Sequence, residues 1–414
     1  MKPPSVPDVS GSETRAVPPT ARRGRRRRGR TAGAGGRRSA RLTWLLAAVL
    51  AGAAATPAAG MAGGPGIDGT SPGPREAATT DSPVFRVERV ADGVWAAIVR
   101  PYPPAHAFAN SLVVAGDSAV LIVDTQQSPV AARELVARLP GLTDRPVRWV
   151  VNTHRHADHH RGNVAWREAH PGVTVVSLSG TRRWIRVEGE AGLARDRERV
   201  RLALEETRAA MANSGAPPGG VERDRLRRRV RLLEQYGEAL AGLVTVPADV
   251  AFEGELEIDL GGRIVRLLDF GAAHSEADLV VSVPDAAVVA AGDLLEEGLP
   301  YVADADPEAW LAALRRLRGL EADVWVPGHG SVQGDGDLLA RHLRAFAAVE
   351  RWLADPGSDG VRRPARAACR AAWNVGPDPC RRWLEALGDR SAALAGEDGR
   401  PEGPAEPVAP GPAP

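Results

Sequence analysis

The hydrophobic positions of this chain change their period several times between residues 84 and 350. Short apolar runs bounded by Asp-Gly, Gly-Asp and similar pairs predict strands. These runs lie at 85–99, 110–125, 147–154, 174–179, 262–270, 278–284 and 287–293. The stretch from Ser128 to Leu139 instead has helical spacing, with Ser128 as N-cap and Pro129 in the first turn. Strands with a buried pattern that alternate with helices predict a layered α/β fold.

One highly charged segment interrupts this alternation. Residues 188–243 have a helical period and are split by the sequence SGAPPGG at 214–220. Two helices joined by such a short turn predict an antiparallel helical hairpin. The hairpin either covers a site or makes a dimer contact, or it is only a solvated excursion from the domain.

The N-terminal region differs in charge from the rest of the chain. Residues 1–41 contain Lys2, the only lysine, and eleven arginines against two acidic residues, so their net charge is +10 and that of the remainder is about −9. The uncharged segment 42–63 has an apolar part of about 14 residues, which is short for a membrane span and typical of a signal peptide. Arg37-Arg38 precedes it, as in a twin-arginine signal. We therefore expect export to the periplasm or the medium, with an uncleaved membrane anchor as the alternative.

Composition divides the chain into five parts. We expect a basic region with a signal peptide or anchor at 1–63, a linker at 64–83, a folded domain at 84–353, a helical extension at 354–391 and a disordered tail at 392–414. The only two cysteines, Cys369 and Cys380, lie in the extension. They can form one disulfide if the protein is exported, and two unpaired thiols are the alternative.

The acidic balance of residues 42–414 excludes one class of partner. Binding to a nucleic-acid backbone requires a basic face, and this part of the chain has the opposite charge. We therefore expect a small-molecule substrate and no nucleic acid. Membrane contact is expected only through the N-terminal segment, if that segment stays uncleaved.

Four of the nine histidines stand within seven residues of one another. The sequence THRHADHH places His154, His156, Asp158, His159 and His160 directly after a predicted strand. Residues two apart in an extended chain point the same way, so His154 and His156 can reach one ion. Asp158 and His159 follow where the chain must turn, and they can hold a second ion nearby. Imidazole and carboxylate are ligands that zinc prefers, and packing such polar groups together without a metal would be costly.

The pattern HxHxDH after a strand that ends in Asn-Thr resembles the metallo-β-lactamase-fold hydrolases, a superfamily that includes glyoxalase II. The resemblance covers about residues 84–350 and implies a four-layer αβ/βα sandwich, here with an inserted helical hairpin. Four further motifs follow the family's order: VLIVDT, FGAAHSEADLVV, VVAAGDLL and VPGHGSV. They contain Asp124, His274, Asp293 and His329, respectively.

Carried over residue by residue, the resemblance implies a dinuclear metal site. The first ion would be held by His154, His156 and His274, the second by Asp158, His159 and His329, and Asp293 would bridge the two. Asp124 and Asp278 would support the ligands without binding metal. The cofactors would be two divalent ions, zinc in the first place, with iron or manganese as alternatives.

Two features depart from the family's pattern. A gap of 115 residues separates His159 from His274, and the predicted hairpin accounts for the excess length. Ala277 stands where the family has glycine before the aspartate. Four histidines receive no ligand role: His106, His160, His170 and His342. We expect His160 to be partly exposed beside the site and His342 to lie on the surface of a helix.

The resemblance implies metal-dependent hydrolysis of an ester-like bond. A metal-bound hydroxide, oriented by Asp158, would be the nucleophile, because zinc lowers the pKa of bound water to about 7. Aspartate at the bridging position, rather than Cys or Ser, favours thioesters and esters, while lactones, phosphoesters, sulfate esters and β-lactams stay open. His106 and Tyr301 are candidates for the substrate pocket. An iron-dependent oxidoreductase similar to persulfide dioxygenases is the alternative on the same fold, and the complete second metal site disfavours it.

Overall fold

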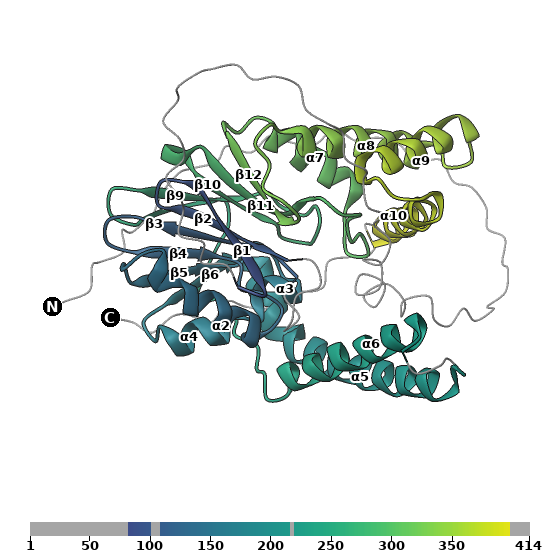
Figure 1. Ribbon diagram of the computed structural model, residues 1–414. Coiled ribbons are helices and arrows are strands. Elements are labelled where there is room, and N and C mark those ends of the chain that lie inside the picture. Colours follow the sequence, from purple (N-terminus) through teal and green to yellow (C-terminus); the bar gives the residue numbers. More distant parts are fainter. Residues whose placement is uncertain (1–81, 101–107, 216–218, 398–414) are drawn as a thin grey trace, which may run out of the picture. The chain divides into compact units, whose positions relative to one another are not determined.

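The structure is a computed structural model that describes residues 82–100, 108–215 and 219–397 of the 414-residue chain. These residues form two β-sheets enclosed by helices (Figure 1). The predicted signal peptide and linker up to residue 81, His106 and the tail from residue 398 lie outside the described residues. Within the described residues, the structure contains no helix that is both long and apolar enough to cross a membrane.

The first sheet has seven strands in sequence order. They are β1 (Phe85–Ala91), β2 (Val94–Val99), β3 (Ser111–Ala115), β4 (Val120–Val123), β5 (Val147–Val151), β6 (Thr174–Leu178) and β7 (Val250–Phe252). Strands β1 to β4 pair antiparallel and β4 to β7 pair parallel. Parallel neighbours need a crossover. The crossover from β4 to β5 contains α2 (Pro129–Arg138) and the short η2 (Leu139–Gly141), and the next contains α3 (Ala157–His160) and α4 (Asn163–Ala169).

The second sheet has five strands in the order β12 (Val324–His329), β11 (Val288–Glu296), β10 (Leu279–Val283), β9 (Ile264–Asp269) and β8 (Glu255–Asp259). Strands β8 to β11 pair antiparallel, with η3 (Pro284–Ala286) between β10 and β11. Strand β12 returns parallel to β11 after α7 (Pro307–Leu317).

Three apolar clusters arrange these elements into four layers. One cluster lies between the sheets and includes Leu121 and Val281. A second joins the outer face of the first sheet to α2 and α4 through residues such as Trp166. The third joins the second sheet to α7 and α8 (Asp337–Ala354) through Trp310 and Phe346, and Figure 1 shows these helix pairs on opposite sides of the sheets. The predicted four-layer αβ/βα sandwich is therefore confirmed.

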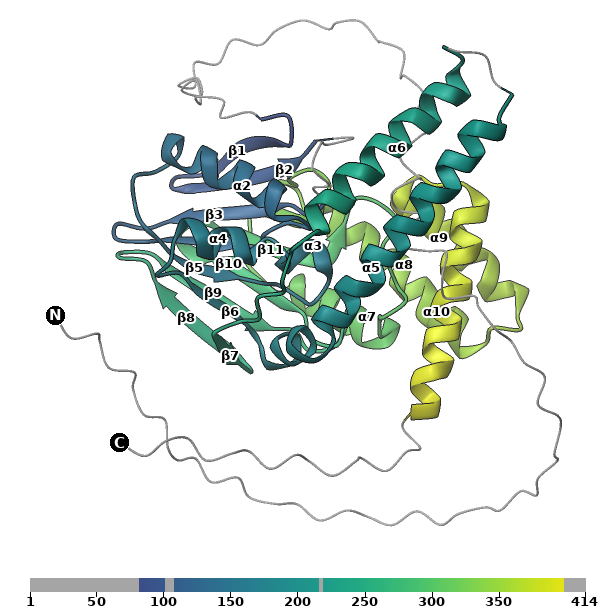
Figure 2. The same cartoon turned by 90° about the horizontal axis from the view of Figure 1, so that it is seen from below.

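The inserted helical hairpin is also confirmed. It consists of α5 (Ser179–Asn213) and α6 (Val221–Leu240), which lie side by side between β6 and β7 in the chain (Figure 2). The first helix starts at Ser179, earlier than the predicted residue 188, because it continues directly from β6. Arg197 Nε donates to the carbonyl of Leu240 at 3.0 Å, and Arg208 pairs with Glu234 at 2.7 Å.

The C-terminal part of the described chain forms α9 (Asp359–Trp373) and α10 (Pro377–Glu397). A disulfide joins the fully buried Cys369 and Cys380, so the two thiols are paired. Helix α10 continues past residue 391, where the sequence predicts a disordered tail. Its Trp383 and Leu387 belong to the apolar cluster under α8, which holds the preceding turns of the helix against the domain.

Candidate metal centre

Seven polar side chains converge where strands of the two sheets end. His154 and His156 follow β5, Asp158 and His159 lie on α3, His274 lies between β9 and β10, Asp293 lies on β11, and His329 is the last residue of β12. Ligand sites in α/β folds commonly lie beyond the carboxyl ends of strands. The structure thus brings together residues that are up to 175 positions apart in the sequence.

A first cluster surrounds the Nδ1 atom of His156. This atom lies 3.0 Å from Nε2 of His154 and 2.8 Å from Nε2 of His274. Oδ2 of Asp293 lies 3.6 Å from Nε2 of His154 and 3.4 Å from Nε2 of His274. Because zinc–nitrogen bonds are about 2.0–2.1 Å long, atoms at these separations fit the ligand sphere of one ion.

A second cluster adjoins the first. Oδ2 of Asp158 lies 3.3 Å from Nε2 of His329 and 3.7 Å from Nε2 of His159. Asp293 contacts this cluster as well: its Oδ1 is 3.2 Å from Nε2 of His159, and its Oδ2 is 3.4 Å from Nε2 of His329. Asp293 is therefore the one side chain of the seven that reaches both clusters.

Each cluster combines buried and part-exposed donors. In the first cluster the side chain of His154 is 1% exposed and that of His156 is 16% exposed. In the second cluster the side chain of His159 is fully buried, and those of Asp158 and His329 are 19% and 26% exposed.

The donor atoms of the centre fit divalent metal ions. Nε2 of His159 and Oδ1 of Asp293 are buried, and neither has a well-formed hydrogen bond among the described residues. An unsatisfied buried polar atom costs about 1–3 kcal/mol, and a charged one costs more. A cation in the second cluster would satisfy both atoms, and the first cluster offers the same imidazole and carboxylate donors, which zinc, iron and manganese accept.

The charges of the centre are tightly linked. Burial raises the pKa of Asp158, but the neighbouring His159 and His329 lower it. The net result is a pKa of Asp158 below its usual value. Burial lowers the pKa of His154 and takes that of His274 to about 3, so both rings are neutral at pH 7. Burial also opposes the protonation of His159 and His329, but the surrounding carboxylates raise both pKa values well above normal. Any cation must therefore compete with protons on those two rings.

Asp124 lies behind the second cluster, at the end of β4. Its carboxylate accepts hydrogen bonds from the backbone N–H and the hydroxyl of Thr153, both at 2.8 Å, and lies 2.7 Å from Nδ1 of His159. This contact turns Nε2 of His159 toward the other donors. Asp124 has a positive φ of 56°, a backbone conformation that aspartate tolerates better than most residues.

Asp278 lies behind the loop that carries His274. Its carboxylate accepts hydrogen bonds from the backbone N–H and the hydroxyl of Ser275, at 2.9 and 2.8 Å. Burial raises the pKa of Asp278 to about 6. Asp278 therefore fixes the turn directly after His274, although Ala277 replaces the glycine of the family's pattern.

The loop between β11 and α7 supplies a residue that the sequence did not reveal. Oδ2 of Asp304 lies 3.1 Å from Nε2 of His156 and 3.1 Å from Nη2 of Arg155. Tyr301, a candidate pocket residue, lies in the same loop with its ring centre 5.3 Å from that of His156. The sequence predicted Tyr301 as a pocket residue, but no spacing rule connects Asp304 to His156.

Glu296, at the end of β11, is a second residue that the sequence did not reveal. Its Oε1 atom lies 4.0 Å from Nδ1 of His274, and both atoms lack hydrogen-bond partners among the described residues. Burial, followed by the charge of Asp293, raises the pKa of Glu296 well above its usual value. Glu296 therefore lies beside the centre, and with Asp293 and His329 it offers a further group of donor atoms that could hold a metal ion.

Two predictions about histidines outside the ligand set were wrong. His342 is fully buried, because the face of α8 that carries it packs onto β11, and its Nε2 accepts from the backbone N–H of Glu296 at 3.3 Å. His160 is 2% exposed rather than partly exposed, because α3 turns it away from solvent.

The helical hairpin contacts the chain segment that carries Asp158 and His159. Arg161 is buried two positions after His159, and its Nη2 lies 2.6 Å from Asp196 of α5. Its Nη1 donates to the hydroxyl of Tyr236 of α6 at 3.2 Å, and Gln127 also bonds to that hydroxyl. Both hairpin helices are thus anchored beside the second cluster.

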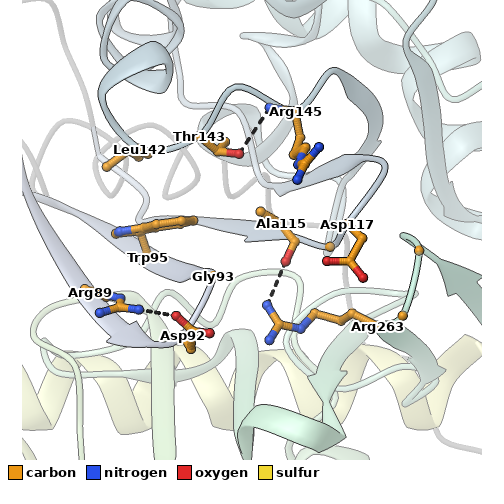
Figure 3. Close-up of a pocket in the computed structure, with 13 residues that line it drawn as sticks. Arg89, Asp92, Gly93, Trp95, Ala115, Asp117, Leu142, Thr143, Arg145 and Arg263 are labelled. Carbon is orange, nitrogen blue, oxygen red and sulfur yellow. Dashed lines mark hydrogen bonds and ion pairs between the residues drawn. The ribbon is translucent and has the colours of Figure 1, made fainter.

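A separate hollow of about 410 Å³ lies at the other end of β5 (Figure 3). It is lined by the turns before β2, after β3, before β5 and before β9. Two of its arginines are already engaged: Arg89 pairs with Asp92, and Arg263 donates to the carbonyl of Ala115 at 2.7 Å. We therefore place the functional site at the histidine cluster and not in this hollow.

Comparison with known proteins gives one family. The family model for the metallo-beta-lactamase superfamily matches residues 106–329. The chain is similar to a linear primary-alkylsulfatase of a Pseudomonas species, at 26% identity over 57% of this chain and 44% of the relative. It is also similar to the alpha subunit of a 2,4-dinitroanisole O-demethylase of a Nocardioides species, at 26% identity over 64% of this chain and 61% of the relative. The chain spans about half the length of these relatives.

Solved structures with a similar arrangement are metallo-beta-lactamases. One from Pontibacter korlensis is 22% identical, with a TM-score of 0.43 over 64% of this chain and 99% of that chain. Another, from Erythrobacter litoralis, is 18% identical, with a TM-score of 0.42 over 63% of this chain and 94% of that chain.

Proposed function

Because this chain belongs to the metallo-beta-lactamase superfamily, we propose that it is a hydrolase that cleaves an ester-like bond at a centre of two divalent metal ions. One observation carries this proposal: the seven donor side chains form two adjoining clusters, and Asp293 belongs to both. A centre of one metal would require only the first cluster, so the second cluster favours hydrolysis over the iron-dependent oxidoreductase alternative.

Each donor has a role in this proposal. His154, His156 and His274 would hold the first ion, Asp158, His159 and His329 the second, and Asp293 both. When bound, such ions lower the pKa of water to about 7 and polarise the oxygen of the bond that breaks. Among the candidate metals, zinc matches the imidazole and carboxylate donors well.

Two residues would act on water and substrate. The carboxylate of Asp158 is ionised and 19% exposed, so it can accept a hydrogen bond from the attacking water and orient it. Burial raises the pKa of Tyr301 to about 12, so its hydroxyl stays protonated at pH 7 and can donate to a substrate oxygen.

The names of the two relatives help to rank the bonds that this chain could cleave. One relative is named for alkyl sulfates, which are esters, and the other is named for removing a methyl group from an ether oxygen. Neither name refers to a β-lactam. We therefore place sulfate and carboxylic esters first among the substrates, before thioesters, lactones and phosphoesters, with β-lactams last.

We also propose that the protein is exported. The support is the uncharged apolar segment 42–63 together with the buried disulfide between Cys369 and Cys380, because such disulfides persist in oxidising compartments.

A hydrolysis panel tests the activity. The purified protein, loaded with zinc or manganese, is given an alkyl sulfate, an aryl ester, a thioester, a lactone, a phosphodiester and a β-lactam. We expect turnover of one class that a chelator abolishes. The double variant Asp158→Ala/His159→Ala should lose this turnover, whereas His170→Ala, outside both clusters, should keep it. Full activity of the double variant would contradict the proposal.

A further inference from the structure

The loop of residues 297–306, which we call the Asp304 loop, joins β11 to α7 and supports a ligand from behind. His156 faces the other donors through Nδ1, and Asp304 holds its second nitrogen, Nε2, at 3.1 Å. A carboxylate on the far nitrogen of a ligating histidine fixes the orientation of the ring and makes the other nitrogen a better donor. Small shifts of Asp304 should therefore change the affinity of the first cluster for metal.

Helix α10 donates two hydrogen bonds to the backbone of this loop, one on each side of Asp304. Nε1 of Trp383 donates to the carbonyl of Pro300 at 3.0 Å, and Nε of Arg390 donates to the carbonyl of Ala305 at 3.0 Å. Pro300 and Ala305 are the direct neighbours of Tyr301 and Asp304. The backbone that carries both side chains is thus tied to a helix outside the four layers.

Helix α10 is also held by contacts outside the loop. The disulfide joins its Cys380 to Cys369 of α9. The ring of Trp383 packs against those of Trp373 and Phe346, with ring centres 4.9 and 5.7 Å away. Val302 and Ala305 of the Asp304 loop belong to the same apolar cluster, so the loop packs against the core to which α10 is fixed.

We propose that Trp383 and Arg390 are positioning residues for the metal centre, which hold the Asp304 loop so that Asp304 keeps His156 in its ligand orientation. The C-terminal helical extension would then contribute to metal affinity, although no residue of it contacts the clusters. This role goes beyond the proposed hydrolysis, because it concerns metal binding whatever reaction follows.

Metal affinity provides the test. The variants are Asp304→Ala, the double variant Trp383→Phe/Arg390→Met, and the control Arg381→Met, whose side chain pairs only within α10, with Asp378 and Glu385. Zinc affinity is measured by competition with a chromophoric chelator. Asp304→Ala should weaken the binding of one ion about 10- to 100-fold. The double variant should weaken it about 10-fold, at the lower end of the range for supporting contacts, and the control should not weaken it.

Combining the variants separates positioning from stability alone. If α10 acts through Asp304, adding Trp383→Phe/Arg390→Met to Asp304→Ala should cause no further loss of zinc affinity. The double substitution should still lower the thermal midpoint of the metal-free protein by the same amount in wild type and in Asp304→Ala. The proposal would be overturned if Trp383→Phe/Arg390→Met bound zinc as tightly as wild type. It would also be overturned if this double substitution weakened zinc binding by the same factor in wild type and in Asp304→Ala. Arg390→Met alone, at a half-buried position, repeats the test if the double variant does not fold.

Discussion

At the scale of single residues, the centre depends on carboxylates that hydrogen-bond to the second ring nitrogen of its histidines. Asp124 fixes His159 and Asp304 fixes His156. The seven donors were predictable, because short motifs at strand ends and the family resemblance mark them. Asp304 and Glu296 were not, because their contacts depend on how a loop and a strand end pack against histidines from other elements.

Asp124→Asn should weaken metal binding about 10- to 100-fold. The carboxylate accepts three contacts through two oxygens, and an amide NH₂ group would oppose at least one of the donors. Chelator competition measures the effect. Asp117→Asn, at an exposed position in the turn after β3, is the matched control. Equal zinc affinity of Asp124→Asn and wild type would show that Asp124 does not support His159.

His342 should make the protein less stable in acid. Burial lowers its pKa to about 4 in the folded state, whereas the unfolded value is about 6.5. Between these values only the unfolded state takes up the proton, so the free energy of unfolding falls as the pH falls from about 6.5 to 4. This residue accounts for about 2 kcal/mol between pH 7 and pH 5.

Chemical denaturation at both pH values checks this effect. His342→Gln should lower stability at pH 7, but it should lose about 2 kcal/mol less than wild type on going to pH 5. Identical pH dependence of the two proteins would mean that folding does not change the pKa of His342.

At the scale of elements, sequence patterns predicted the strands that lie in the middle of the sheets. Of the edge strands they included β1 but not β7, β8 or β12. Strand β7 has only three residues, and β8 alternates Glu255, Leu256, Glu257 and Ile258, so neither forms a continuous apolar run. The helical hairpin was predicted from its period, but its attachment beside the second cluster through Arg161 was not, because a buried arginine is not distinguishable from the many exposed ones.

Arg161→Met should loosen the hairpin. Removing one partner of a buried ion pair costs about 3–5 kcal/mol, and Asp196 is only 21% exposed. Hydrogen exchange should become faster in α5 and α6, but not in α2. Arg201→Met removes ion pairs with Glu198 and Glu205 from the exposed side of the same helix and should leave exchange unchanged. Equal exchange in both variants would mean that Arg161 does not anchor the hairpin.

At the scale of the whole molecule, the C-terminal extension is a structural part of the domain. Its helices bury Cys369, Trp373 and Trp383 in the same cluster as α7 and α8. The sequence predicted helices in this region, and it left the state of the two cysteines open. Contacts from α10 to the Asp304 loop join residues more than 80 positions apart, and no local pattern records such pairs.

Cys369→Ala/Cys380→Ala should lower the free energy of unfolding by about 3 kcal/mol, the value expected for a disulfide that closes a short loop. The two cysteines are 11 positions apart. Denaturation of the metal-free protein is compared with and without a phosphine reductant. The reductant should shift the midpoint of wild type toward that of the variant and leave the variant unchanged. A wild-type midpoint that does not respond to reduction would show that the disulfide does not stabilise the fold.

The number of metal ions per chain tests the central claim most directly. The protein is equilibrated with zinc, freed of loosely bound metal, and analysed by elemental mass spectrometry against its concentration. We predict two ions per chain in the wild type and one in Asp158→Ala/His159→Ala, because the first cluster stays complete in that variant. One ion or none in the wild type, or two ions in the variant, would contradict a dinuclear centre formed by these seven side chains.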